Sequence, residues 1–457
     1  MPIIINNLGV LAWGVMASYL LFLALTSFFE SAYTTYSRRK FPEIMVRGNL
    51  GAFDTEFALI VKVVKWVSGF YITLLILSIA NGESHLNDGF FILSAAFFSS
   101  LIRLYSGFYR CFIASQNSQI TLATINGFAL VLRPCLISVL VIAGVTNLKL
   151  LILGYILTHI LEMVLLKREV SKLRVLRNNV TDLSGDVLQV FIKIYGAYCF
   201  SALLSVYVMN ADKLFSWIFQ LDLEFAEYSI FATVTGLFYV VVNSAVTAFN
   251  PVLTEKIINK ESEKIEIFLC WFNALNGVLI FLGISLFVVF ASDIFPFLGI
   301  AFDDLSLENL LLLTLSVALN ATLWMPVAAM ISAGNVNFVV ASNGFKALTL
   351  SLCLGTFFLE DNTLSFYSAV LIASVISTLF LTLYMWFHMK MGLLGRFRYL
   401  ALSFGPPALI LAGIYFKEQL YYFTSQLEGG SKLIIATFIL VICFWVILSA
   451  YRRGKLL

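Results

Sequence analysis

Four basic residues lie inside stretches of the sequence that are otherwise almost entirely apolar. Arg103 lies in SLIRLYSG, Arg133 in ALVLRPCLIS, Lys346 in NGFKALTL, and Lys193 in a fourth apolar stretch. An arginine keeps its charge in proteins, and a cation at the centre of a bilayer costs at least about 2.5–3.5 kcal/mol. A guanidinium binds carboxylates and phosphates through paired N–H groups, so these residues point to the binding of an anion.

Two explanations account for these cations. In the first, each one forms a structural pair with Glu30, Glu162 or Glu227, or with backbone carbonyl groups freed near Pro134. In the second, Arg103, Arg133 and Lys346 converge on one water-filled cavity and bind an anionic ligand there. We favour the second explanation for the group, because acidic residues inside the apolar stretches are fewer and lie mostly near their ends.

The sequence carries no pattern typical of catalysis or of a metal site. The three histidines are scattered, the six cysteines lie in apolar stretches without a CxxC pair, and no nucleotide-binding or hydrolase motif is present. His159 and Glu162 lie three residues apart, which favours a polar pair over a proton relay. A net charge of +3 gives no indication of nucleic-acid binding. We therefore expect neither an enzyme nor a cofactor.

The elements that carry these residues are membrane-spanning helices. Of the 457 residues 60% are hydrophobic and 12% are charged, whereas about a quarter of a soluble domain is charged. Apolar stretches of about twenty residues, long enough to cross a bilayer, recur to the end of the sequence. We expect an all-α polytopic membrane protein. The predicted spans are 8–30, 57–80, 89–113, 120–143, 148–166, 188–208, 225–248, 265–291, 307–331, 336–358, 364–387, 399–415 and 433–450.

Charge in the connections predicts the orientation. Lysine and arginine concentrate in alternate connections such as YSRRK and LLKREVSKLR, while the opposite connections carry acidic stretches such as NGESHLND. The positive-inside rule places the basic set in the cytoplasm, together with the C-terminus, and places Met1 outside.

The two halves of the sequence resemble each other at a shift of 217 positions. INGFALVL at 125–132 aligns with SNGFKALT at 342–349, and Ser27 and Ser115 match Ser244 and Ser332. Parallel repeats of this kind are a transporter design with the substrate path between the lobes. The first helix of the second half has no partner, so we expect the first lobe to lack its opening helix. The expected parts are an N-lobe at 1–166, a cytoplasmic linker at 167–187, a C-lobe at 188–388 and two additional helices at 389–457.

The stretch at 210–255 carries a resemblance to a known family. It contains Asp212–Lys213 after the first helix of the second half, then Ala226-Glu227-Tyr228 at the start of the next helix, and Asn250, Pro251 and Glu255 at its end. This arrangement resembles the polysaccharide exporter family, the O-antigen flippase (Wzx-like) branch of the MATE-like (MOP) superfamily that also contains the lipid II flippase. The segment YRCFIASQNSQITLATINGFALVLRP is similar to the matching part of that family's first half. Ala226 stands where glycine is usual.

The resemblance implies a function. It implies translocation of an undecaprenyl-diphosphate-linked oligosaccharide across the bacterial inner membrane by alternating access, in a setting of lipopolysaccharide or other polysaccharide biosynthesis. Arg103, Arg133 and Lys346, with Asp212 and Lys213, are then the candidate substrate-binding residues. The lipid tail stays among the membrane lipids, and polysaccharide polymerase and chain-length proteins are potential partners.

Three other classes of protein fit the sequence less well, and one of them, a structural membrane protein, is disfavoured by the internal repeat. A cation-coupled exporter of small drugs on the same fold predicts an acidic cavity, whereas the spans hold more cations than anions. A membrane-embedded polysaccharide polymerase or ligase commonly carries a large external loop with arginines, and the external connections here are short and acidic.

Overall fold

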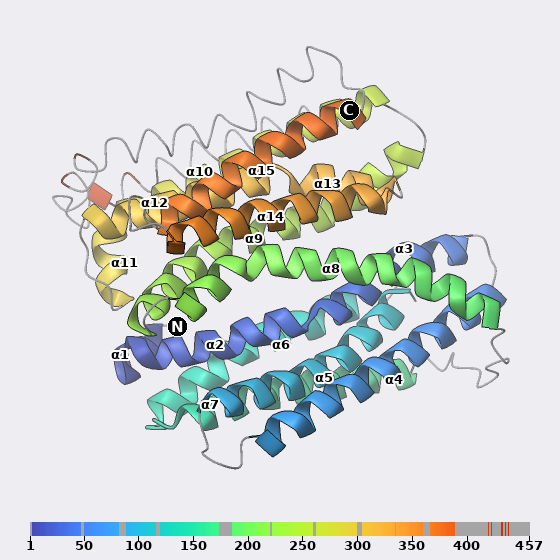
Figure 1. Cartoon of the computed structure of the whole chain (residues 1–457), viewed down its shortest axis with the longest axis horizontal. Coiled ribbons are helices and arrows are strands. Elements are labelled where there is room, and N and C mark those ends of the chain that lie inside the picture. The colour runs from blue at the N-terminus through green and yellow to red at the C-terminus, as the bar shows by residue number, and fades with distance from the viewer. Residues whose placement is uncertain are drawn as a thin grey trace. The chain divides into compact units, whose positions relative to one another are not determined.

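The described part of the computed structural model consists of helices joined by short turns (Figure 1). The structure describes residues 2–46, 50–81, 88–115, 119–172, 185–219, 222–258, 262–298, 304–333, 335–359 and 366–388, with Gln419, Tyr422, Ser431, Lys432, Ile435 and Thr437. The helices are α1 (Pro2–Leu8), α2 (Val10–Thr26), α3 (Phe28–Val46), α4 (Leu50–Asn81), α5 (Asp88–Ser115), α6 (Gln119–Ile142), α7 (Leu148–Lys172), α8 (Gly185–Phe219), α9 (Asp222–Ile258), α10 (Ser262–Val289), α11 (Ala291–Phe297), α12 (Asp304–Ala321), α13 (Trp324–Ser332), α14 (Val336–Leu359) and α15 (Phe366–His388).

The all-α membrane fold predicted from the sequence is confirmed. Among the described residues, eight helices are long and apolar enough to cross a membrane, or nine when the bent pair α2 and α3 counts as one span. The predicted spans at 399–415 and 433–450 lie outside the described segments, apart from isolated residues of the second. The total of thirteen helices and the absent first helix therefore stay predictions.

Two predicted spans are interrupted. The span expected at 8–30 bends by 45° between α2 and α3. The span expected at 307–331 divides into α12 and α13, whereas the span expected at 265–291 lies almost entirely in α10, which ends at Val289. The hydrophobic pattern predicts that a stretch is long enough to span the membrane, but it does not predict where the helix is interrupted.

The internal repeat is visible in the bounds of the helices. Helices α6 and α14 have 24 residues each, and both their first residues (119 and 336) and their last residues (142 and 359) are 217 positions apart. Helix α5 ends at Ser115 and its counterpart α13 ends at Ser332, which is the same shift. The sequence repeat therefore corresponds to a repeat of structural elements.

The chain divides into two units, residues 3–210 and residues 211–457, the second together with residues 1–2. We call them the N-terminal unit and the C-terminal unit. In the first, α5 packs against α2, α4 and α7, and α6 packs against α7. In the second, α12 packs against α9, α10 and α15, and α14 packs against α15. The same packing order within each unit is what two parallel repeats predict.

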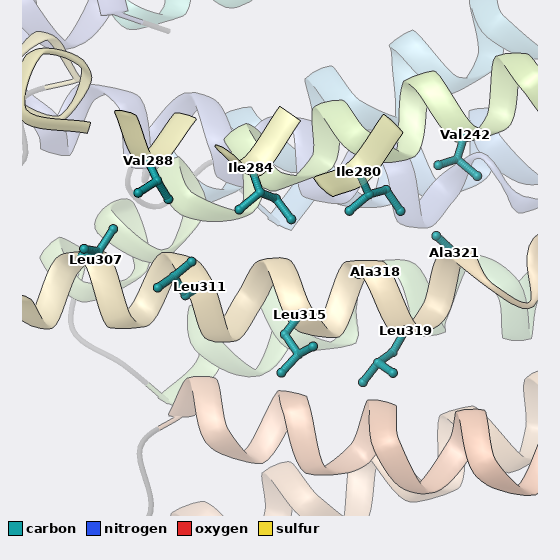
Figure 2. Close-up of a cluster of buried hydrophobic side chains, with 10 residues drawn as sticks. All are labelled: Val242, Ile280, Ile284, Val288, Leu307, Leu311, Leu315, Ala318, Leu319 and Ala321. Carbon is teal, nitrogen blue, oxygen red and sulfur yellow. The ribbon is translucent and has the colours of Figure 1, made fainter. Parts of the chain in front are cut away.

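Apolar side chains at helical spacing form the core of the C-terminal unit. Figure 2 shows Ile280, Ile284 and Val288 of α10 in a row that faces α12, where Leu307 and Leu311 continue the contact. Spacing of four residues keeps each row on one face of its helix. Because lipid is as apolar as leucine, close packing between these rows, rather than removal from water, holds the helices together.

Candidate functional site

The bend between α2 and α3 places a glutamate inside the N-terminal unit. The Ser27 hydroxyl donates to the carbonyl of Ala24 at 2.7 Å, and Thr26 donates to the carbonyl of Phe22 at 2.8 Å. The Tyr71 hydroxyl donates to the carbonyl of Thr26, so side chains satisfy the carbonyls that the bend releases. Glu30 lies in the first turn of α3, where the partial positive charge of the helix N-terminus stabilises a carboxylate.

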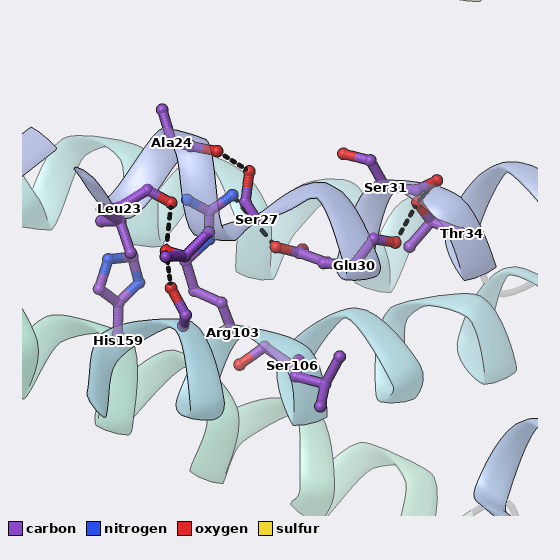
Figure 3. A network of polar contacts seen from close by, with 12 residues as sticks. Leu23, Ala24, Ser27, Glu30, Ser31, Thr34, Arg103, Ser106 and His159 are labelled. Carbon is purple, nitrogen blue, oxygen red and sulfur yellow. Dashed lines mark hydrogen bonds and ion pairs between the residues drawn. The ribbon is translucent and has the colours of Figure 1, made fainter. Parts of the chain in front are cut away.

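Helix α5 presents two arginines to this glutamate. Arg103 and Arg110 are seven residues apart, which puts both on one face of the helix, two turns from each other. Gly107 lies between them, and a Cβ atom there would come within 2.8 Å of Glu30 Cγ. Glycine therefore lets α3 approach α5 closely enough for the charged groups to meet. Figure 3 shows Glu30 and Ser27 on the bent pair beside Arg103 and Ser106 of α5.

Helices α6 and α7 supply the rest of the charged groups. Arg133 comes just before Pro134 inside α6, and a proline there removes one backbone hydrogen bond of the helix. Glu162 and His159 share a buried face of α7. The side chain of Glu162 is only 2% exposed.

These residues form one connected network. Arg103 Nη2 lies 3.1 Å from Glu30 Oε2, and Arg110 Nη1 lies 3.0 Å from Glu30 Oε1. Arg110 Nη2 also donates to Glu162 Oε1, and Arg133 Nη2 donates to Glu162 Oε2. The order along the network is therefore Arg103, Glu30, Arg110, Glu162, Arg133. We call these five residues the arginine network.

The arginine network carries more positive than negative charge. Three guanidinium groups meet two carboxylates, a formal surplus of one positive charge. The carboxylates are 2% and 10% exposed, whereas the arginines are 20% to 28% exposed. The negative groups are thus enclosed, and the positive groups have surface left to meet a ligand. Arginine, which stays charged, suits such a site better than lysine.

His159 lies beside the network without joining it. Its Nδ1 is 3.9 Å from Glu162 Oε2, too far for a hydrogen bond, and neither ring nitrogen has a hydrogen-bond partner among the described residues. The ring packs edge-on against Tyr155, with centroids 5.2 Å apart. The shared face of His159 and Glu162 predicted from their spacing is present, and the contact between them is loose.

The structure brings two of the predicted site residues together. Arg103 and Arg133 belong to the same network, and their carboxylate partners are Glu30 and Glu162, which the structural explanation named. Lys346 belongs to the C-terminal unit. Lys193 is exposed on α8 and is not part of the network.

Asp212 and Lys213 also belong to the C-terminal unit. The Tyr228 hydroxyl donates to Asp212 Oδ2, and Asp212 Oδ1 has no hydrogen-bond partner among the described residues. Asp212 of α8 and Tyr228 near the start of α9 are two of the residues that carry the family resemblance, and they are in direct contact. Tyr228 in turn packs against Phe366 and Tyr367 of α15.

Lys346 is a buried cation on α14. Its side chain forms no hydrogen bond or ion pair with any described residue, and the residue is 9% exposed. Ser342 lies one turn earlier on α14, and Thr378 and Thr382 lie on α15, which packs against α14. The hydroxyls of these three residues are buried and lack a partner among the described residues.

Trp324 and Tyr105, two aromatic residues of the predicted spans, have partners among the described residues. Trp324 stacks on Tyr239 with centroids 5.2 Å apart, and the Tyr105 hydroxyl accepts a hydrogen bond from Ser68 at 3.2 Å. Trp324 therefore has at most one free ring face.

Arg110 is the member of the arginine network that sequence analysis missed. It lies near the end of its apolar stretch, where an arginine is ordinarily read as an interfacial residue. Its spacing of seven from Arg103 was the available signal, because two arginines on one face of a spanning helix need a shared partner. No group of three potential metal ligands occurs among the described residues.

Three solved structures share this fold. The lipid II flippase MurJ in an inward closed conformation has a TM-score of 0.63 at 12% identity, with 98% of this chain and 99% of that chain covered. An inward-facing multidrug resistance MATE family transporter of the MOP superfamily has a TM-score of 0.61 at 14% identity, with 85% and 93% covered. An outward-facing transporter of the same description has a TM-score of 0.57 at 16% identity, with 85% and 88% covered.

The sequence itself matches no protein-family profile and no curated protein. At these identities the structural likeness concerns the fold. The proteins named above are multidrug transporters and a lipid II flippase. The chain is thus a multi-pass membrane protein with the two-lobed helical fold of the MATE transporters and the lipid II flippase.

Proposed function

We propose that the protein is a flippase of the O-antigen (Wzx-like) branch. It moves an undecaprenyl-diphosphate-linked oligosaccharide, such as an O-antigen repeat unit, from the cytoplasmic to the periplasmic face of the inner membrane by alternating access. The glycan and its diphosphate cross through the protein while the lipid tail stays among membrane lipids. The C-terminus is cytoplasmic, and polysaccharide polymerase and chain-length proteins act on the exported unit.

The observation that carries this proposal is the surplus positive charge of the arginine network. A diphosphate offers several acceptor oxygens, and arginine binds phosphate through two parallel N–H groups. In Arg103 and in Arg133 one Nη pairs with a carboxylate. Each guanidinium therefore has further N–H groups that can bind a ligand. Both side chains are partly exposed, at 28% for Arg103 and 20% for Arg133, while Arg133 Nε itself is buried.

The extent of the structural likeness supports the same proposal. The lipid II flippase matches over nearly the whole of both chains, whereas the two multidrug transporters match 85% of this chain. Similarity over the full length to a protein whose name refers to a lipid-linked substrate favours a substrate of that class.

The alternative is a cation-coupled exporter of small molecules. This alternative is considered because multidrug transporters have the same fold. Export of cationic drugs needs carboxylates that are free to bind them. In the arginine network both carboxylates are enclosed and paired with arginines, and the unbalanced charge is positive. An anionic substrate fits this site better.

A complementation experiment tests the proposal. A strain that lacks the gene receives the wild-type protein, Arg133→Ala or Arg168→Gln, and surface polysaccharide is normalised to the amount of protein in the membrane. Arg168 is an exposed arginine of α7 outside the network, so its variant is a matched control. We expect export with the wild type and the control, and accumulation of lipid-linked oligosaccharide inside with Arg133→Ala. Normal surface polysaccharide in the deletion strain, with altered drug sensitivity, would favour the small-molecule exporter.

A further inference from the structure

Arg110 differs from the other two arginines in the way it is bonded. It is the only member of the network that contacts both carboxylates, with Nη1 on Glu30 and Nη2 on Glu162. Arg103 contacts Glu30 alone, and Arg133 contacts Glu162 alone. Arg110 therefore joins α3 and α7 through α5, and its two Nη groups are occupied.

The charge of the network depends on this residue. Without Arg110, Arg103 and Glu30 form one neutral pair, and Arg133 and Glu162 form a second. With Arg110 the same two carboxylates are shared among three guanidinium groups. Each carboxylate then divides its attraction between two cations, so the outer arginines are less fully compensated and attract a further anion more strongly.

We infer that Arg110 is the positioning residue of the site: it holds Glu30 and Glu162, and its charge lets Arg103 and Arg133 bind a diphosphate-type anion. Arg110 itself does not contact the ligand. This inference rests on the proposed function for the identity of the ligand, but its physical content is the affinity of the network for an anion.

Changing the charge step by step separates this role from a purely structural one. Arg110→Leu removes the surplus, Glu162→Gln raises it by one, and the double variant Arg110→Leu/Glu162→Gln restores it. We expect the affinity for the anion to fall about tenfold or more in Arg110→Leu, to rise in Glu162→Gln, and to return to within about threefold of wild type in the double variant. Arg168→Leu, which removes an exposed arginine of α7, should bind as wild type.

A structural role alone predicts a different pattern. Both single variants would lose thermal stability, and neither would gain affinity, because each breaks a buried pair. The rise in affinity of Glu162→Gln is thus the readout that a structural role does not produce. Arg110→Lys gives a second check: it keeps the charge but reaches one carboxylate at a time, so it should bind more tightly than Arg110→Leu and more weakly than wild type.

The measurement uses the full-length protein in nanodiscs, with undecaprenyl diphosphate and inorganic pyrophosphate as separate probes. The expected order of affinity for undecaprenyl diphosphate is Glu162→Gln, then wild type and the double variant, then Arg110→Leu. If wild type and Arg110→Leu bind undecaprenyl diphosphate equally, the role of Arg110 is wrong and the proposed function stands. If only pyrophosphate binds, in the expected order, the role of Arg110 stands and the lipid-linked substrate is wrong. If neither probe binds, both are wrong.

Discussion

Helices α6 and α14 have equal lengths and bounds that are 217 positions apart, yet their basic residues meet different surroundings. Arg133 on α6 is paired with Glu162 of α7. Lys346 on α14 lies one turn before the position equivalent to Arg133, which is Leu350, and it has no charged partner among the described residues. The same backbone element therefore carries a compensated cation in one unit and an uncompensated cation in the other.

The difference extends to the whole arginine network. At the shift of 217, Arg103 corresponds to Asn320, Arg110 to Val327 and Glu162 to Leu379. Asn320 makes a neutral contact instead, donating to the Ser374 hydroxyl at 3.1 Å. The repeat thus preserved the packing order of the helices while only the N-terminal unit holds a charged network in the described residues. A charge that packing does not require points to a role in function.

The largest effect is expected where the N-terminal unit loses a ligand-binding cation. Arg133→Ala should abolish export at unchanged protein level, and Arg133→Lys should keep part of it, because lysine retains the charge but not the paired N–H groups. Surface polysaccharide normalised to membrane protein is the measurement. Normal export by a well-expressed Arg133→Ala protein would falsify the binding role, and a loss that only follows protein abundance would favour a structural role.

The next effect concerns the stability of the N-terminal unit. Glu162→Ala leaves Arg133 and one Nη of Arg110 without their carboxylate inside the unit, which should cost about 3–5 kcal/mol. Thermal unfolding of the purified protein measures the loss. Glu169→Ala is the matched control, since Glu169 lies on the same helix and pairs with the exposed Lys172, a contact worth about 0–1 kcal/mol. Equal loss in both variants would contradict the importance of the buried network.

Replacing Lys346 tests whether the two units differ in the way they hold a buried cation. Lys346→Met removes a buried ammonium that has no counter-charge among the described residues, so unfolding temperature should stay the same or rise. Arg133→Met is the matched change on the repeat-equivalent helix. It should lower the unfolding temperature, because Glu162 Oε2 loses its arginine partner. If Lys346 binds substrate, as its position in the sequence predicts, export falls in Lys346→Met despite the unchanged stability. A lower unfolding temperature in Lys346→Met would show that it has a structural partner.

The sequence predicted the helices and part of the site, for reasons that particular residues make clear. Apolar flanks of ten or more residues identify Arg133 as intramembrane, and Glu162 was among its named partners. The break at Ser27 was not predicted, because the hydrophobic pattern continues through it, although hydroxyl side chains that bond back to Phe22 and Ala24 can bend a helix. Arg110 was missed because its partners come from α3 and α7, which are brought together only by tertiary packing.

The smallest effect is expected at the neutral counterpart of Arg103. Asn320 donates to Ser374 and to the carbonyl of Ser316, and Ser316 and Ser374 also share a hydrogen bond at 2.6 Å. Asn320→Ala removes a neutral donor and leaves the bond between the two serines in place, so it should cost about 0.5–1.5 kcal/mol.

Arg103→Ala, the corresponding change in the N-terminal unit, should cost more, since Glu30 is a buried carboxylate that loses one of its two cations. The unfolding temperatures of Arg103→Ala and Asn320→Ala, measured side by side, show which variant loses more stability. A loss in Asn320→Ala as large as in Arg103→Ala would mean that neutral hydrogen bonds hold the C-terminal unit as firmly as charges hold the N-terminal unit. The difference in charge between the two repeats would then have no effect on stability. Anion binding would be the remaining explanation for the charged network of the N-terminal unit.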